Sequence, residues 1–366
     1  MKVHLLFRRI LLMLYAFALL ACSSNELKVK QKNFDTEISQ QQNLIFTFNK
    51  DIAKPDELER WDTLPYIKFE PAVRGKFKWL ASNQLLFSPE VGFEASTSYE
   101  ASLQNGLLRE EKLRLSNKKI AFSTPAIELQ GSHSFWAKGP GGQPELQSLL
   151  YFNYQINPED LKKRLSVSVE GQTYTPRVIS ANADKEILIG VADAALAKYQ
   201  ESSIQVEIAA GLLSTESATP SKEKISHQGR IPDKNKLEIN EVEAIFNENM
   251  EAGLRVLCSQ IPEESALRGS LALIPESNYQ VERIAGGFLL KGNFNPLQSY
   301  SFRLAKGLRG ALGGRLAEEY STQVSFGELN PQIAFSDKKA TYLSSKGSKN
   351  VGVKIVNVGK IKVSIY

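Results

Sequence analysis

The sequence predicts an all-β fold built from tandem immunoglobulin-like β-sandwich domains, and three observations predict it. Short segments in which apolar and polar residues alternate recur along the chain, and this period of two marks a strand with one buried face. One such pattern repeats at intervals of about 100 residues, the size of an immunoglobulin-like sandwich. Helical patterning is confined to two short segments, residues 158–163 and 193–199.

The repeated pattern joins an aromatic or branched residue to an apolar residue four positions later and a glycine three positions after that. The apolar residues that alternate before each glycine predict a strand, and the glycine gives the backbone freedom to leave the sheet. The three copies start at Tyr99, Ile204 and Tyr300, and their glycines are Gly106, Gly211 and Gly307.

Each copy also has a matching opening strand, at Phe48, Tyr154 and Phe246. Copies one and three share a middle strand, residues 85–87 and 288–290, in which we expect core side chains. The segment 214–235 is rich in Ser, Thr, Lys and Pro and is interpreted as a linker or a long exposed loop. The predicted domains are therefore a signal peptide (1–21), a first sandwich (22–125), a second sandwich with its linker (126–235), a third sandwich (236–330) and the first strands of an incomplete domain (331–366).

The N-terminal residues 1–21 have the pattern of a secretory signal peptide. Lys2, Arg8 and Arg9 provide a positive start, and residues 10–21 are an unbroken run of apolar and small residues. A helix of this length spans about 18 Å, which is too short for a bilayer core of about 30 Å. Removing these three basic residues lowers the formal net charge from +5 to +2, so no nucleic acid partner is expected.

The signal ends in a sequence that resembles a bacterial lipobox, formed by Leu19, Leu20, Ala21 and Cys22. The chemistry requires a cysteine at this position, because its thiol takes the diacylglycerol before cleavage. We therefore predict lipid attachment at Cys22 and a membrane partner held through that lipid. Several acyl chains on one cysteine anchor a protein durably. The expected location is the cell envelope, at the outer membrane or the periplasmic face.

Composition and motifs give little sign of chemistry. Two cysteines exclude a disulfide scaffold, and three histidines make a histidine-rich metal centre or a Ser-His-Asp hydrolase an unfavourable interpretation. We expect no cofactor, no metal and no catalysis. The glycines of residues 139–142 and 307–314 lack the spacing of a phosphate loop, and we interpret them as an exposed turn and a hairpin loop.

Isolated polar residues also have structural interpretations. Glu241 and Glu243 would share a solvated strand face, and residues 184–186 would form a charged turn. The surrounding residues favour Cys258 as a small buried hydrophobe. The remaining side chains singled out are His133 and His227, interpreted as surface histidines, Trp79, interpreted as core, and Trp136, whose exposure would indicate a ligand contact.

The C-terminal residues 351–355 and 360–365 alternate strongly, and Asn357, Val358 and Gly359 between them predict a hairpin. A regular strand edge at a terminus invites aggregation, so we expect the chain to be a truncated product or a fragment.

Two segments resemble the N-terminal part of a bacterial α2-macroglobulin. The first runs from Phe77 and Trp79 to Tyr99 and is similar to the bacterial Ig-like domain that precedes the macroglobulin domains. The second, residues 342–365, resembles the opening strands of a macroglobulin domain. The resemblance implies protease trapping, in which a protease cuts a bait segment, the domains close around it, and in many members a Cys-x-Glu-Gln thioester reacts.

Cys258 is followed by Ser259 and Gln260, which does not match the thioester motif, and no bait segment is recognisable. The resemblance therefore implies a non-catalytic, membrane-anchored stalk that meets host or foreign proteases through downstream domains outside this chain. Two other classes stay open. A lipid-anchored adhesion or ligand-binding module would use an exposed aromatic patch around Trp136, and a stalk for an enzyme domain would be recognised by the sequence after Tyr366.

Overall fold

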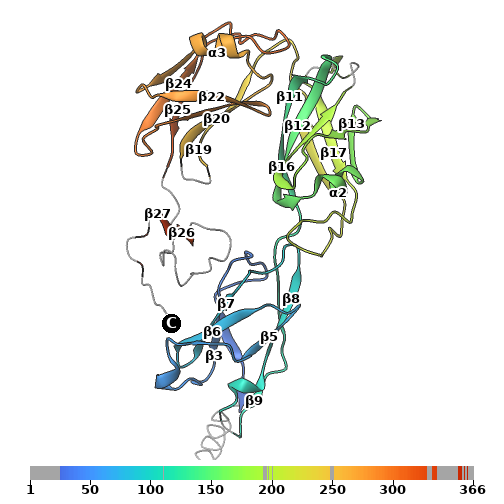
Figure 1. The fold of residues 1–366 in the computed structure, drawn as a ribbon. Helices are drawn as coiled ribbons and strands as arrows, with labels where there is room; N and C mark the ends of the chain where they lie inside the picture. Colours follow the sequence, from blue (N-terminus) through green and yellow to red (C-terminus); the bar gives the residue numbers. More distant parts are fainter. Residues whose placement is uncertain are drawn as a thin grey trace, which may run out of the picture.

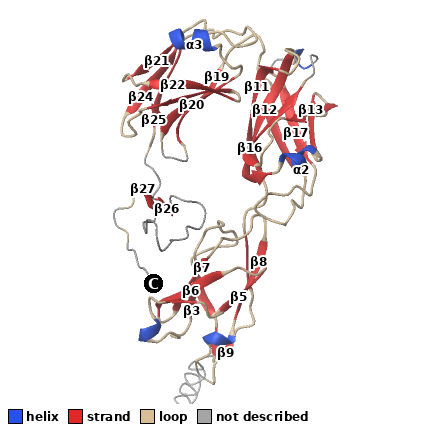
Figure 2. Cartoon of the chain, in the orientation of Figure 1, coloured by secondary structure: helices blue, strands red, loops and turns tan. Residues whose placement is uncertain are grey.

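The computed structural model describes residues 25–327 except 110, 193–195, 197, 200 and 248–250, together with 332–335, 353–356, 358 and 361. Strands dominate this part of the chain, and the α-helices are short (Figure 2). Three two-sheet sandwiches follow one another around an arc (Figure 1). The predicted all-β fold of tandem immunoglobulin-like sandwiches is confirmed.

All three sandwiches share one strand order. With the shared strands lettered A to G along each sandwich, one sheet contains the order A-B-E-D and the other contains the order G-F-C. The first sandwich adds a short strand, Trp61–Asp62, beside strand D, and the second adds Gln172–Tyr174 beside strand C. Every pairing within these sheets is antiparallel, and this is the arrangement of a constant-type immunoglobulin domain. Adjacent strands of this topology place one face of each sheet in the core, which explains the alternating sequence.

The first sandwich has an aromatic core. Its β3 strand buries Leu44, Phe46 and Phe48 on one face, and Trp79 from β6 lies in the same core, as predicted. A short parallel pair, β1 (Glu26–Leu27) and β9 (Arg114–Leu115), lies outside the two sheets. The sheets consist of β2 (Val29–Lys32), β3 (Leu44–Phe48), β7 (Gln84–Pro89), β6 (Gly75–Ala81) and β4 (Trp61–Asp62), and of β10 (Ile120–Ser123), β8 (Ser98–Leu103) and β5 (Ile67–Glu70).

The second sandwich has the longest strands. Its α2 helix (Pro158–Lys162) begins as predicted, with Pro158 in the first turn and the Asn157 side chain accepting a hydrogen bond from the Glu159 amide at 2.9 Å. The other predicted helical segment, 193–199, lies largely outside the described residues. The sheets consist of β11 (Leu129–Lys138), β12 (Pro144–Ile156), β16 (Asp184–Val191) and β15 (Arg177–Val178), and of β18 (Ile225–Arg230), β17 (Ser203–Ile208), β13 (Leu165–Val169) and β14 (Gln172–Tyr174).

The third sandwich is followed by a separate pair of strands. It carries the α3 helix (Glu264–Ser270) between its B and C strands. After it, β26 (Gln332–Phe335) and β27 (Val353–Val356) pair antiparallel. The sheets of the sandwich consist of β19 (Ile239–Phe246), β20 (Ala252–Cys258), β23 (Gly287–Gly292) and β22 (Tyr279–Ile284), and of β25 (Tyr320–Ser325), β24 (Ser299–Leu304) and β21 (Leu271–Ile274).

The sequence repeat corresponds to the F strand. Its three copies form β8, β17 and β24, as predicted, and the shared middle strand of copies one and three is the E strand, β7 and β23. The predicted opening strand is wrong for the third copy. Phe48 and Tyr154 lie in B strands, whereas Phe246 ends the A strand β19. Two neighbouring strands with the same alternation cannot be told apart by period alone.

Two further expectations need correction, and a third lies largely outside the described residues. The predicted linker 214–235 contains β18, an edge strand with alternating burial whose polar residues conceal it in the sequence. Residues 184–186 begin β16 and do not form a turn. At the C-terminus β27 pairs with β26, which the sequence did not reveal, and the predicted partner strand 360–365 lies outside the described residues except for 361.

Candidate functional site at the domain junctions

The predicted lipid-attachment residues cannot be placed. Cys22 and the lipobox residues Leu19, Leu20 and Ala21 fall outside the described residues. No helix in the described part of the chain is long and apolar enough to cross a bilayer. Across the same ranges, no three His, Cys, Asp or Glu side chains come together as metal ligands would. The features that remain are the two junctions between sandwiches and the surfaces beside them.

The junction between the second and third sandwiches is built on the outer face of a sheet. Strand β11 of the second sandwich lies beside the chain that follows β20, where the Trp136 amide donates to the Ser259 carbonyl at 2.8 Å. A small apolar cluster fills the space between the two sandwiches, separate from their own cores. Its members are Phe135, Ala137, Leu149, Tyr151 and Leu188 from the second sandwich, and Ile261 and Ala285 from the third.

Trp136 is buried in the core of the second sandwich, next to this junction, and it is not the exposed aromatic residue that ligand binding would require. Its side chain is 1% exposed, and the indole nitrogen donates to the Pro232 carbonyl at 2.7 Å. Strand β11 runs on into the glycine turn 139–142, and its local pattern does not show that the next domain covers its outer face. The turn itself is exposed, as predicted. The adhesion hypothesis therefore loses its candidate residue.

His133 also lies in this junction, so its interpretation as a surface histidine is wrong. Its Nε2 atom lies 3.1 Å from the Cys258 carbonyl oxygen, and its ring stacks on Phe135 at 5.7 Å between centroids. Gly286 must lack a side chain here, because a Cβ would come within 2.7 Å of the imidazole. Burial lowers the pKa of His133, although hydrogen bonds to the carbonyls of Gly286 and Cys258 act in the opposite direction.

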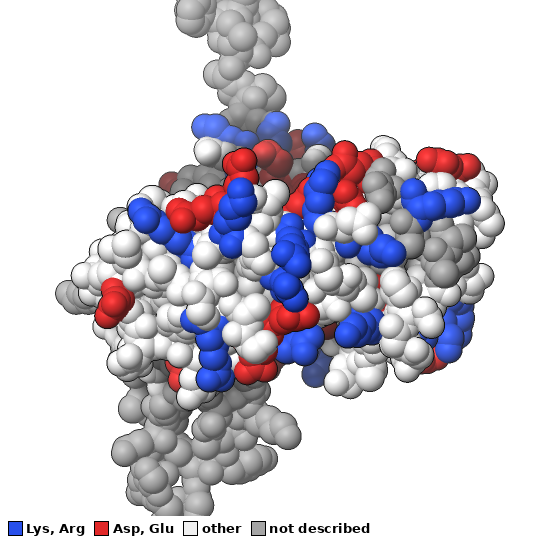
Figure 3. All heavy atoms as spheres, turned by 90° about the horizontal axis from the view of Figure 1, so that it is seen from above, with Lys and Arg blue, Asp and Glu red and all other residues white. Residues whose placement is uncertain are grey.

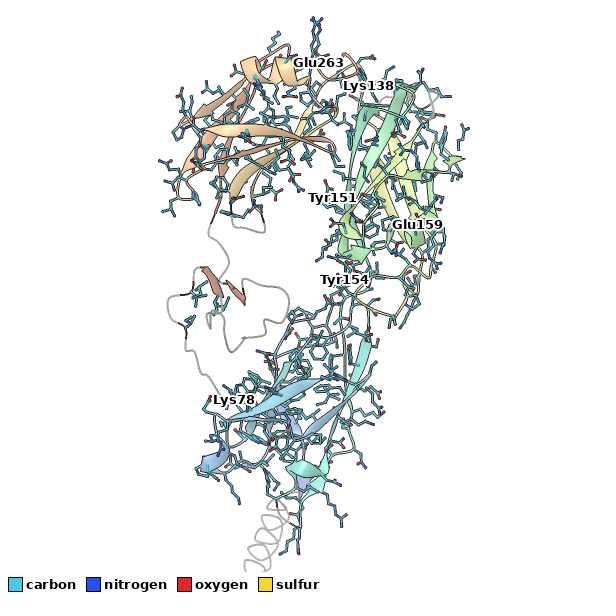
Figure 4. All side chains as sticks on the ribbon, viewed as in Figure 1. Lys78, Lys138, Tyr151, Tyr154, Glu159 and Glu263 are labelled. Atoms are coloured by element: carbon cyan, nitrogen blue, oxygen red, sulfur yellow. The ribbon has the colours of Figure 1, made fainter. Side chains whose placement is uncertain are left out.

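An ion-pair cluster closes the lower side of the junction. Arg255 on β20 binds Glu186 of the second sandwich at 2.8 Å and Glu243 of its own sheet at 3.0 Å. Burial lowers the pKa of Arg255, but these two carboxylates more than offset it. Tyr151 faces this cluster from the second sandwich (Figure 4), and burial raises its pKa to about 12. The predicted pairing of Glu241 and Glu243 on one strand face is correct, but Glu243 is neutralised by Arg255.

Cys258 ends β20 beneath this junction. It is completely buried, as predicted, and burial raises the pKa of its thiol. Because only a thiolate is an effective nucleophile, the side chain is inert at neutral pH. Gln260, two residues later, is equally buried and was missed in the sequence. It donates to the Lys236 carbonyl at 3.1 Å and accepts from the Leu312 amide at 3.2 Å, which fixes the hairpin loop 307–314.

The junction between the first and second sandwiches is a corner contact. The E–F loop of the first sandwich places Ala95 in the core of the second, and the Ala95 amide donates to the Glu216 carbonyl at 3.3 Å. The Thr97 hydroxyl lies 3.2 Å from that of Ser217. Tyr154, at the end of the second sandwich nearest the first (Figure 4), donates to the Pro125 carbonyl at 3.1 Å. An open hollow of about 590 Å³ lies beside these hydroxyl groups.

A second hollow, of about 700 Å³, lies on the third sandwich. It is open and mixed in character, and its polar residues include Glu251 and Lys291. Its walls include Ile245, Asn247, Tyr279, Leu289, Phe294 and Pro296. Seen from above, basic and acidic side chains are interspersed over the visible face of the molecule (Figure 3).

Comparison with known proteins gives one sequence relative. No protein-family profile matches the chain. An alpha-2-macroglobulin homolog of Yersinia pestis is 20% identical over 232 residues, which are 60% of this chain and 12% of that protein. The chain is distantly similar to a bacterial α2-macroglobulin. It spans only a small part of this relative's length.

Solved structures with similar segments are distant. A Salmonella alpha-2-macroglobulin variant is 10% identical, with 86% of this chain and 24% of that chain covered and a TM-score of 0.17. The glycan-binding protein SGBP-B of Bacteroides ovatus is 11% identical over 87% of this chain and 71% of that chain, with a TM-score of 0.24. An L,D-transpeptidase of Mycobacterium tuberculosis is 17% identical over 34% of this chain and 45% of that chain, with a TM-score of 0.18. At these scores none of them bears on function.

Proposed function

We propose that this chain is the membrane-anchored, non-catalytic N-terminal stalk of a bacterial α2-macroglobulin-like protein that traps proteases. The observation that carries the proposal is the similarity over 232 residues to the alpha-2-macroglobulin homolog. Anchoring through Cys22 is part of the proposal and follows from the lipobox sequence. The trapping itself would belong to domains beyond these residues.

The chemistry of the described residues supports a structural role. The thiol of Cys258 is buried, and its raised pKa makes it unsuitable as a nucleophile. The junction between the second and third sandwiches combines an apolar cluster, a backbone hydrogen bond and the ion pairs of Arg255. Such a junction holds two domains in one orientation, which a stalk requires if downstream domains are to close around a protease.

The trapping test uses the complete product of the native locus, purified in detergent from its own membranes. The product is incubated with trypsin, and activity is measured on a small chromogenic peptide with and without a proteinaceous trypsin inhibitor. A trapped protease still cleaves the small peptide but is shielded from the large inhibitor. We expect shielded activity that rises with the amount of product, and heat-denatured product serves as the control. If the inhibitor abolishes peptide cleavage at every ratio, protease trapping is wrong.

The anchoring test follows incorporation of labelled palmitate. The parent protein should carry the label and sediment with membranes, whereas the variant Cys22→Ser should carry none. Cys258→Ser is the matched control, because its buried thiol cannot receive the lipid and labelling should be unchanged. Equal labelling of Cys22→Ser and the parent would contradict attachment at Cys22 without touching the trapping hypothesis.

A further inference from the structure

The first and third sandwiches share one arrangement of a hydrogen bond and aromatic rings at the loop between strands E and F, which we call the corner. A tyrosine at the start of strand F accepts a hydrogen bond from the backbone amide five residues earlier, at 2.8 Å from Glu94 and 2.7 Å from Asn295. A phenylalanine one residue before that amide meets the tyrosine edge to face, at 5.3 Å and 5.4 Å between ring centroids. The rings, with a third from the end of strand G, are Phe93, Tyr99 and Phe122 in the first sandwich, and Phe294, Tyr300 and Phe326 in the third.

The two corners differ in what covers them. Ala95 follows the amide donor in the first sandwich and is 0% exposed, and Thr97 is also buried. In the third sandwich Pro296 occupies the position of Ala95 and is exposed, and the next residue, Leu297, is 95% exposed. Pro296 therefore lacks the burial that Ala95 has, and Leu297 is more exposed than its half-buried counterpart Ser96.

The second sandwich is what covers the first corner. Ala95 belongs to the same apolar core as Ile127 and Leu129, the residues with which the chain enters the second sandwich. The corner therefore caps one end of the next domain's core. Leu129 lies seven residues after Phe122, so the chain passes directly from strand G over the corner into the next strand A.

The chain after the third sandwich follows a similar course. Val324 pairs with Tyr300 as Phe122 pairs with Tyr99, and Ile333 lies nine residues after Val324 on strand β26, the next strand along the chain, as β11 is after the first sandwich. Ile333 pairs directly with Ile355 of β27, so Ile333, Ile355 and Val353 share one face of this two-stranded sheet. All three are exposed. Within the part of the chain that the structure describes, this sheet thus presents an uncovered apolar face, and the corner of the preceding sandwich presents an exposed apolar surface.

We propose that the corner formed by Pro296 and Leu297 is the docking site for the sandwich that begins with β26 and β27, and that it caps the core of that sandwich as Ala95 caps the core of the second. The occupant is the segment of this chain from Gln332 onward. The open hollow of about 700 Å³ beside Phe294 and Pro296 provides the room for it. The proposal holds whether or not the protein traps proteases, so its test is independent of the trapping test.

The experiment measures how fast introduced thiols react with a maleimide carrying a polyethylene glycol chain, in the complete native product. Leu297→Cys reports on the third corner. Val91→Cys, 80% exposed on the E–F loop of the first sandwich, reports on an uncovered position. The parent chain gives the background from its own cysteines, of which Cys258 is buried.

We expect Leu297→Cys to react at least about tenfold more slowly than Val91→Cys, because a covered thiol reacts only when the docked segment opens. Adding Ile333→Asp should bring Leu297→Cys to the rate of Val91→Cys. The matched control is Ser321→Asp, at an exposed position on strand β25, which introduces the same charge outside β26 and should leave the slow rate unchanged. Equal rates for Leu297→Cys and Val91→Cys in the parent background would overturn the proposal. A slow rate for Leu297→Cys that persists after Ile333→Asp is added would also overturn the proposal, because another partner would then cover the corner.

Discussion

The two junctions between sandwiches are held by different kinds of interaction. The first and second sandwiches meet at a corner, through one buried alanine and a few hydrogen bonds among Thr97, Ser217 and their neighbours. The second and third sandwiches meet across a sheet face, through an apolar cluster, the imidazole of His133 and the ion pairs of Arg255. The burial of apolar surface supplies most of the free energy of association, so the second junction should be the stronger.

This comparison shows that domains with the same fold can contact their neighbours through different surfaces. All three sandwiches have the same strand order, yet one junction uses the E–F corner and the other uses the outer face of the A-B-E-D sheet. Which surface a sandwich offers to its neighbour depends on side chains that do not affect the fold itself. Single substitutions can therefore test each junction separately.

The largest effect is expected from Trp136→Ala at the stronger junction. The indole is buried in the core of the second sandwich and bonds the Pro232 carbonyl in the connection to the third. Its removal leaves a cavity and an unpaired carbonyl, so the free energy of unfolding should fall by about 3–5 kcal/mol. Denaturant unfolding followed by circular dichroism measures this.

The matched control for Trp136 is Trp61→Ala. Trp61 is 46% exposed, and its ring lies 5.1 Å from the Lys78 ammonium. Losing this contact should cost about 0.5–1 kcal/mol. If the two tryptophan variants are equally stable, the burial assigned to Trp136 is wrong.

The next effect is expected from Arg255→Ala. Glu186 and Glu243 would lose their shared partner, and the contact between the two sandwiches would lose its ion pair, so stability should fall by about 2 kcal/mol. Limited proteolysis between residues 231 and 238 should become faster. Arg283→Ala is the control, because Arg283 lies on β22 at the edge of the same sheet and forms no ion pair with the residues that the structure describes. Unchanged cleavage in Arg255→Ala would show that the apolar cluster alone holds the junction.

A smaller effect is expected from acid at the same junction. Burial lowers the pKa of His133, so the unfolded chain binds the proton more readily than the folded one. The stability that this residue contributes is therefore complete above its ordinary pKa of 6.5 and is lost as the pH falls below that value. Arg255 nearby disfavours the imidazolium further.

The measurement for His133 is the melting temperature between pH 7.5 and pH 5. The parent should lose more stability on acidification than His133→Gln, whose amide does not titrate. His227→Gln, at a half-buried position on the edge strand β18 and away from the junction, should behave as the parent does. A parallel decline in all three proteins would mean that His133 titrates normally.

The smallest effect is expected at the corner, from Thr97→Val. The Thr97 hydroxyl donates to the Ala95 carbonyl at 2.7 Å and lies near Ser217 of the second sandwich. Replacing it with an isosteric methyl group should cost about 1 kcal/mol. The exposed neighbour Ser98→Ala should cost less than half as much. A loss in Thr97→Val as large as in Trp136→Ala would reverse the ranking of the two junctions.

Strand positions were predictable because they depend on local alternation. The F strands and the two tyrosines at Tyr99 and Tyr300 follow from a pattern of buried and exposed residues that any single sandwich must satisfy. The third opening strand was wrong because A and B strands share that pattern, and β18 was hidden because its exposed face is polar.

The junction residues were not predictable from the sequence. His133 lies on the outer face of a strand that another domain covers, and no local pattern distinguishes a covered outer face from a solvated one. Trp136 lies on the inner face of the same strand, and its indole nitrogen finds its partner 96 residues later in the chain. Gln260 is a polar residue that is buried only because the carbonyls of Lys234 and Lys236 and the amide of Leu312 surround it. Their roles depend on residues more than 20 positions away.

The corner contact between the first and second sandwiches also has a mechanical consequence. A pull on the N-terminal end that is resisted beyond the third sandwich passes through both junctions in series. At the corner the load falls on a few hydrogen bonds at one edge, which open one after another, whereas at the sheet face the cluster around Phe135 must slide as a whole. Under tension the molecule should therefore bend first between Pro125 and Leu129, while the second and third sandwiches keep their relative orientation and move as one rigid body.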